Sequence, residues 1–238
     1  MDKIKKLQEL IDNSNYIVFF GGAGVSTESG IKDFRGKNGL YKNNIFAFPP
    51  EYLLSHSCLI NEPSLFFEYY RNNMNSLNAK PNITHKYLKK LEDTGKLKAI
   101  ITQNIDGLHQ KVGSSNVLEI HGTIRKCYCM KCHKDYSGEI IFNSLDIPKC
   151  DCGGIIRPSV TLYEESLPKE FDDAINYIRN ADLLIVAGTS LTVFPACNLV
   201  RYLNNGHLVI INLDTTPYDN YAELVINKPL GEVFSKLK

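Results

Sequence analysis

One stretch near the N-terminus limits what this chain can fold into more than any other. Residues 16–20, Tyr-Ile-Val-Phe-Phe, are continuously apolar, as in a strand that is buried on both faces. Gly21, Gly22 and Gly24 follow at once, and glycines allow a sharp turn and let a ligand approach the backbone closely. Residues 25–29 are typical of a helix start, where free N–H groups favour a phosphate. This order predicts a parallel α/β sheet that holds a dinucleotide pyrophosphate.

This motif is incomplete, and by itself it leaves two interpretations open. The spacing Gly22-x-Gly24-x-x-Thr27 lacks the third glycine of the usual dinucleotide fingerprint, and no Gly-Lys-Ser/Thr of a P-loop follows. A tight turn that binds no ligand fits the same residues. Residues further along the chain are needed to separate the two.

Four further apolar runs are predicted strands, and small or polar residues follow each of them. The runs span 97–102, 117–120, 182–187 and 208–211, and they are followed by Gln103-Asn104-Ile105-Asp106, His121-Gly122-Thr123, Gly188-Thr189-Ser190 and Asn212-Leu213-Asp214. Helical spacing lies between them, at 85–94, 168–180 and 195–204, which implies a parallel sheet. Because the carboxyl ends of parallel strands emerge at one edge, we expect a polar ligand pocket there.

Composition excludes several other classes of protein. With 238 residues, 43% hydrophobic and 22% charged, the chain is typical of a soluble globular protein of one large domain, or one domain with an insert. A net charge of +1 gives no hint of a nucleic-acid partner, and no apolar run is long enough to cross a membrane. Residues 1–14 resemble an amphipathic helix and not a signal peptide. We expect a cytoplasmic protein with no nucleic-acid or membrane partner.

Two segments add features to the predicted sheet. Residues 30–41 form a polar, loop-like segment with an aromatic and an arginine, Phe34 and Arg35, and are a candidate lid over a ligand or a plain surface loop. Residues 49–77 are crowded with aromatics. We expect one or two helices there, forming a small module with its own apolar face.

Five of the seven cysteines fall within one short segment, which favours a metal site over disulfides. Cys129 and Cys132 form a C-x2-C knuckle, and Cys150 and Cys152 form a tighter C-x-C pair. Four thiolates suit tetrahedral zinc, with Cys127 as an alternative ligand. Four sulfur ligands leave no open position, so the zinc is expected to be structural. A zinc ribbon that grips nucleic acid is the competing interpretation, but acidic residues offset its basic neighbours.

Taken together, these motifs resemble the sirtuins, the NAD-dependent protein lysine deacylases. The resemblance covers nearly the whole chain, through residues 22–36, 102–109, 121–123, the paired cysteines, 188–191 and 211–214. It implies a Rossmann-like NAD-binding domain with helices on both faces of the sheet, made of residues 1–35, 78–123 and 158–238. It also implies a small domain built from a helical insert, 36–77, and a zinc ribbon, 124–157. NAD and an acyl-lysine protein or peptide would meet between the two domains.

The resemblance also implies the roles of individual residues. Asp106 would bind the nicotinamide carboxamide, Asn104 would order the ribose and a water, and His121 would be the catalytic base. The acyl oxygen would attack the nicotinamide ribose, giving nicotinamide, acyl-ADP-ribose and free lysine. The full cofactor-binding set would be Gly22, Ala23, Gly24, Ser26, Thr27, Phe34, Arg35, Gln103, Asn104, Ile105, Asp106, His121, Gly188, Thr189, Ser190, Asn212 and Leu213.

Three departures from the family pattern bear on specificity. The second cysteine pair is C-x-C, which should still bind zinc. Glu164 stands where the family has a glycine in its substrate-pairing strand, so peptide preference is expected to differ, towards basic sequences. Residues 66–71 do not match the Tyr-x-x-Arg pair that binds negatively charged acyl groups, so the acyl group is expected to be uncharged, acetyl or longer.

Other functions remain open at this point. The same activated ribose could be captured by a protein side chain, giving a mono-ADP-ribosyltransferase. A non-catalytic sensor of NAD or ADP-ribose would need no base such as His121. A hydride-transfer dehydrogenase is a weaker rival, because no site for a small carbonyl or hydroxy-acid substrate is evident.

Overall fold

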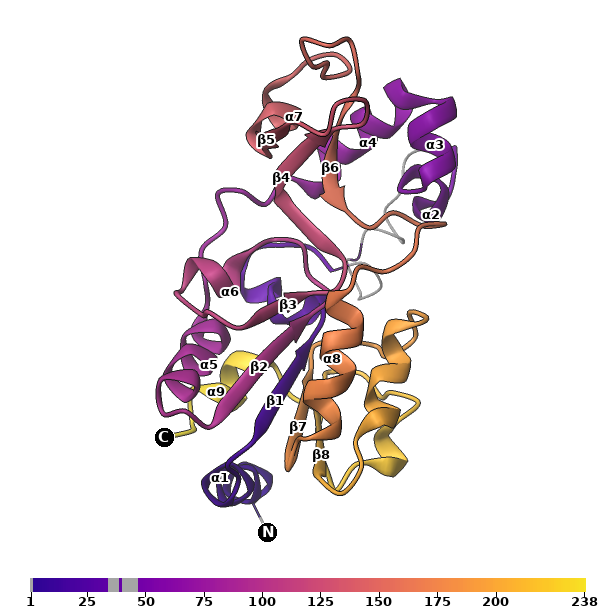
Figure 1. Ribbon diagram of the computed structural model, residues 1–238. Coiled ribbons are helices and arrows are strands. Elements are labelled where there is room, and N and C mark those ends of the chain that lie inside the picture. The colour runs from indigo at the N-terminus through magenta and orange to yellow at the C-terminus, as the bar shows by residue number, and fades with distance from the viewer. Residues whose placement is uncertain (1, 34–38, 40–46) are drawn as a thin grey trace.

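A six-stranded parallel sheet forms the larger part of the computed structural model, which describes residues 2–33, 39 and 47–238 (Figure 1). The order across the sheet is β3-β2-β1-β7-β8-β9, and all neighbouring strands run parallel. The five predicted strands are confirmed, and β9, an edge strand of three residues, was not predicted. The bounds are β1 (Ile17–Gly21), β2 (Leu97–Thr102), β3 (Val117–Glu119), β7 (Leu183–Ala187), β8 (His207–Ile211) and β9 (Leu224–Ile226).

Helices cover both faces of this sheet, as predicted, and create two separate cores. Ile17 and Phe19 of β1 pack against helices α1, α5 and α9, whereas Val18 and Phe20 pack against α8 and the 3-10 helix η3. Successive side chains of a strand point to opposite faces, so a strand between two cores must be apolar throughout. The helices are α1 (Lys3–Asn13), α5 (Ile83–Asp93), α8 (Glu170–Arg179), η3 (Ala196–Tyr202) and α9 (Leu230–Phe234).

A second, antiparallel sheet lies at the other end of the molecule (Figure 1). Its order is β5-β4-β6, and four helices share a third core with it, in which Phe66 and Phe67 meet Ile124 and Ile156. Residues 49–77 hold three short helices instead of one or two, because Pro63 starts a new helix soon after α3 ends. The elements are α2 (Pro50–Leu53), α3 (His56–Asn61), α4 (Pro63–Met74), β4 (Gly122–Cys129), β5 (Asp135–Ser137), α7 (Glu139–Asn143) and β6 (Ile156–Val160).

The prediction that a helix starts after the glycine turn is wrong. Two 3-10 turns, η1 (Ala23–Val25) and η2 (Thr27–Ser29), occupy that stretch and end at Gly30, whose φ is +82°. Side chains there bond to nearby groups, as when the Thr27 hydroxyl donates to the Gly24 carbonyl at 3.0 Å. Such local bonds compete with the regular helical ladder.

Two short elements complete the larger part, α6 (Leu108–Lys111) and the 3-10 turn η4 (Asp219–Tyr221). In the described ranges of the chain, every helix is too short or too polar to cross a membrane.

Candidate functional site

The carboxyl ends of five strands open into one cavity of about 1480 Å³. The expected gathering of polar strand ends at one edge of the sheet is therefore confirmed. The side of the cavity formed by the large sheet is lined by Ala23, Gly24, Ser26, Thr27, Gln103, Asn104, Ile105, Asp106, His121, Gly188, Thr189, Ser190, Asn212 and Leu213. Residues of the small sheet and its helices, among them Leu54, Tyr70 and residues 160–167, form the opposite wall. The cavity exceeds the roughly 300–1,000 Å³ of a site for a single small ligand.

The turns after β1 and β7 press against each other, backbone to backbone. The Gly24 N–H donates to the Gly188 carbonyl at 2.8 Å, and Gly188 has a φ of +60°. A Cβ on Gly24 would lie 2.7 Å from the Gly188 Cα, and one on Gly22 would lie 2.7 Å from the Thr189 Cβ. Gly22 itself does not line the cavity but supports the residues that do. Glycine is required here by the packing of two strand ends.

Hydrogen bonds fix three polar side chains on the floor of the cavity. Ser26 donates through its hydroxyl to Asp106 Oδ2 at 2.6 Å, and the Asn104 amide donates to Ser26 Oγ at 3.1 Å. The Leu108 N–H donates to the other oxygen of Asp106 at 2.8 Å. Asp106 is only 5% exposed, so its carboxylate is held by fixed donors and not by bulk water. The pairing of Ser26 with Asp106 could not be read from residues 80 positions apart.

His121 follows β3 and faces the same cavity. Its Nδ1 lies 3.0 Å from the Gln103 carbonyl. A carbonyl oxygen only accepts, so Nδ1 carries the proton, and Nε2 of the neutral ring is left as an acceptor. Burial lowers the pKa of His121 below its ordinary value, and the bond to the Gln103 carbonyl opposes this only in part. The ring is therefore ready to take a proton at neutral pH.

Two buried histidines, His85 and His109, lie beneath the residues that line the cavity, and the sequence did not indicate that they are paired. The rings of His85 and His109 lie 4.6 Å apart, centroid to centroid, and both are almost fully buried. Burial lowers the pKa of His85 to about 4, against a smaller opposing effect of Asp106, and lowers that of His109 well below its ordinary value. The Asn82 side chain caps α5 by accepting from the backbone N–H groups of Thr84 and His85, and its amide donates to the Val25 carbonyl at 2.7 Å. The pair is neutral and supports the turn after β1.

Two of the expected site residues, Phe34 and Arg35, lie outside the described residues. Residues 31–33, just before them, line the cavity.

The four cysteines Cys129, Cys132, Cys150 and Cys152 lie together at the far end of the small sheet, with their sulfurs all within 4.8 Å of one another. The Cys129 and Cys152 sulfurs are 3.5 Å apart, and those of Cys132 and Cys150 are 3.6 Å apart. A tetrahedron of sulfurs about 2.3 Å from zinc has edges of about 3.8 Å, so the four are placed to hold a zinc ion. Cys127 is not part of the cluster and is buried among apolar side chains.

The chain thus combines a parallel α/β sheet, a large polar cavity at the carboxyl ends of its strands and a separate four-cysteine module, and comparison with known proteins identifies the class of protein that this combination represents. The family model described as "Sir2 family" matches residues 22–195, and the chain belongs to this family. An "NAD-dependent protein deacetylase" of Clostridium acetobutylicum is 53% identical over 237 residues, which are 98% of this chain and 97% of that protein.

Solved Sir2 structures match this chain over nearly its full length. One Sir2 variant, solved with a deacetylated p53 peptide and 3'-O-acetyl-ADP-ribose, has a TM-score of 0.91 and 39% identity, covering 98% of this chain and 96% of that one. Another, described as Sir2 with a p53 peptide and NAD⁺, has a TM-score of 0.88 and 38% identity, with the same coverage of both chains.

Proposed function

We propose that this protein removes acetyl or other uncharged acyl groups from protein lysines in an NAD-dependent reaction, giving nicotinamide, acyl-ADP-ribose and free lysine. The observation that carries the proposal is that Asp106, Asn104 and His121, whose Nδ1 is held by the Gln103 carbonyl, all line one cavity at the carboxyl ends of the parallel strands. The relatives named as deacetylases match essentially the full chain and support the same activity.

The cavity residues fit NAD by their chemistry. Gly24 and Ala23, with Ser26 and Thr27, would hold the pyrophosphate, because the glycine turn exposes backbone to the cavity. The adenosine half would lie along residues 188–190 with Asn212 and Leu213, and the ribose and nicotinamide would lie along residues 103–106. When bound, NAD supplies an electrophilic ribose carbon at which the acyl oxygen replaces nicotinamide.

The chain's own residues then act at fixed places. Asp106, already held by Ser26 and by the Leu108 N–H, would orient the carboxamide. Asn104 would order the ribose and a water. His121 Nε2 would take a proton from a ribose hydroxyl, and its lowered pKa keeps the ring unprotonated for that purpose.

An uncharged acyl group suits the wall that would receive it. Arg71 donates to the carbonyls of Leu145 and Asp146 and does not line the cavity, whereas its neighbour Tyr70 does. Leu54 and Met74 are apolar neighbours on that wall. A carboxylate on the acyl chain would therefore meet no arginine among the described lining residues.

The proposal includes a domain division and a location. Residues 1–35, 78–123 and 158–238 would form the NAD-binding domain, 36–77 the helical module and 124–157 the ribbon with one structural zinc ion. All seven cysteines are free of disulfides, which fits a reducing compartment, and we place the protein in the cytoplasm.

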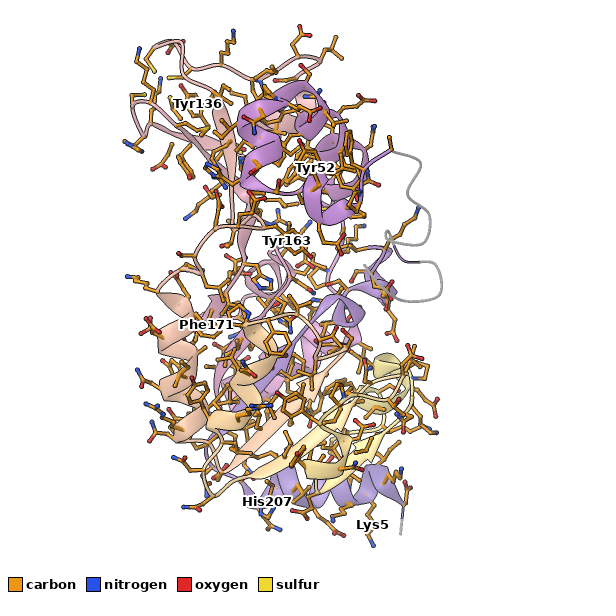
Figure 2. The ribbon with its side chains drawn as sticks, turned by 90° about the vertical axis from the view of Figure 1, so that its right-hand side faces the viewer. Lys5, Tyr52, Tyr136, Tyr163, Phe171 and His207 are labelled. Atoms are coloured by element: carbon orange, nitrogen blue, oxygen red, sulfur yellow. The ribbon has the colours of Figure 1, made fainter. Side chains whose placement is uncertain are left out.

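The test is an acetyl-lysine peptide incubated with and without NAD, with nicotinamide and free lysine peptide measured together. Equal release of both, only with NAD, is expected. His121→Ala should slow it about 10²–10⁴-fold, whereas the matched control His207→Ala, on the exposed amino end of β8 (Figure 2), should not. Transfer of labelled ADP-ribose to protein would favour the transferase alternative. NAD binding without nicotinamide release would favour a sensor.

A further inference from the structure

Glu164 has an unusual backbone conformation for a residue with a side chain. Its φ is +76°, in the left-handed region that glycine tolerates and other residues adopt at a cost. The residue lies in the segment 161–167 that lines the cavity wall. A strained residue at such a place persists only where its surroundings hold it, which makes its contacts informative.

The Glu164 carboxylate is bonded to the helical stretch and does not stand free. Its Oε2 accepts from the Ser57 N–H at 2.9 Å and from the Ser57 hydroxyl at 2.7 Å. These bonds lower the pKa of Glu164 below its ordinary value, so the carboxylate stays charged at neutral pH. One oxygen makes both bonds.

Neighbouring residues extend this contact into a continuous seam. The Tyr163 N–H donates to the Leu54 carbonyl, and the His56 N–H donates to the Tyr163 carbonyl, both at 3.0 Å. His56 Nδ1 donates to Glu165 Oε1 at 2.9 Å. Burial alone would raise the pKa of Glu165, but bonds from Arg157, the Leu162 N–H and His56 outweigh it and lower the pKa to about 2. Figure 2 shows Tyr163 near the middle of the molecule, between Tyr52 and Phe171.

This seam satisfies the exposed donors at the start of α3. The first N–H groups of a helix have no partner inside the helix. That of Cys58 donates to the Ser55 side chain at 3.0 Å, while those of His56 and Ser57 donate to Tyr163 and Glu164. Segment 161–167 therefore anchors the beginning of α3. Leu54, just before this helix, and Tyr70, in the following helix α4, form the other part of the same cavity wall.

We infer that Glu164 is a positioning residue for the peptide substrate: by latching segment 161–167 onto Ser57, it holds the two parts of the cavity wall in register before the peptide binds. This inference rests on the proposed deacetylase function. It is an alternative to the expectation that Glu164 selects basic peptides through its charge: one oxygen of the carboxylate already accepts from two donors on Ser57, and the Gln variant below separates the two roles.

Four variants separate these roles. Glu164→Gln keeps one oxygen to accept from Ser57 but removes the charge. Glu164→Ala removes the latch, and Glu164→Gly removes it while also relieving the backbone strain, so at least one of the two should fold. Glu9→Gln, on the exposed face of α1, is the matched control for loss of a surface charge.

Two measurements decide the outcome. Without the latch, the KM for an acetyl-lysine peptide should rise about five-fold or more, while kcat and the KM for NAD change by less than about two-fold. The Ser57 amide should exchange its hydrogen about ten-fold faster, because its acceptor is gone. Glu164→Gln should retain both wild-type values with neutral and with lysine-flanked peptides.

Other results would overturn the inference. An unchanged peptide KM in Glu164→Ala and Glu164→Gly refutes the latch. A Gln variant that loses only the lysine-flanked peptides assigns Glu164 to charge recognition instead. If the wild-type protein shows no NAD-dependent deacetylation, the proposed function fails, but exchange at Ser57 still reports separately on the latch.

Discussion

Acidification should destabilise this protein through His85, and replacing that residue by glutamine should remove a measurable part of the effect. The imidazole lies against His109 inside the core that supports the turn after β1, and its side chain is fully buried. Glutamine keeps a polar side chain of similar size at the start of α5 but does not titrate.

The sign and size follow from the pKa of His85 in the two states. Burial lowers it from 6.5 to about 4 in the folded protein, so the unfolded chain binds more protons. The stability that depends on a neutral His85 is therefore fully present above pH 6.5 and is lost as the pH falls through 6.5 towards 4. At about pH 5, this linkage amounts to about 2 kcal/mol in the free energy of unfolding. His109, whose pKa is also lowered, adds an effect of the same sign.

Urea unfolding of the zinc-loaded protein at about pH 7.5 and about pH 5 measures this term. The loss of unfolding free energy between the two pH values should be about 2 kcal/mol smaller in His85→Gln than in the wild type. Titrating groups away from His85, zinc ligands included, are common to both proteins and cancel in the comparison. His109 is the exception, because His85 contributes to lowering its pKa, and its change in His85→Gln has the same sign as the loss of His85 itself. His207→Gln, at an exposed histidine, should match the wild type. Equal losses in His85→Gln and wild type would refute the reasoning.

Three further predictions test the site itself. His121→Ala should lower the deacetylation rate about 10²–10⁴-fold while NAD still binds in calorimetry. A rate within two-fold of wild type would refute the assignment of His121 as the catalytic base. Cys132→Ser should lose zinc in a metal assay and lower the Tm, whereas Cys127→Ala should keep its zinc; the reverse result would mean that the ligand set is wrong. Gly24→Ala should raise the KM for NAD about ten-fold or more, because the new Cβ meets Gly188 and forces the two turns apart; an unchanged KM would show that the turns can adjust.

Features carried by a local pattern could be predicted from the sequence. The strand at 97–102 has the predicted bounds because a largely apolar run, interrupted by Lys98, lies between the polar Lys96 and Gln103. The cysteine cluster could be predicted because two short spacings bring each pair of sulfurs together. The common edge of the sheet followed from the handedness and direction that parallel connections impose.

Features that depend on contacts between residues distant in the sequence could not be predicted. Glu164 and Ser57 are 107 positions apart, so nothing near either residue indicated that the carboxylate was already bonded. The pairing of His85 with His109 likewise needs α5 and α6 to pack. The stretch after the glycine turn is polar and small enough for a helix start, but hydrogen bonds to Asp106 and Asn82 favoured 3-10 turns there.

Strand β4 has a mechanical consequence for the reaction. It begins at Gly122, next to the histidine after β3, and ends at Cys129, one of the clustered sulfurs, about 23 Å further on at roughly 3.3 Å per residue. An ion held by the cysteines would therefore brace one end of the strand whose other end adjoins His121, although the two sites never touch. Metal depletion should then appear as a loosened imidazole and poorer proton transfer well before the chain unravels.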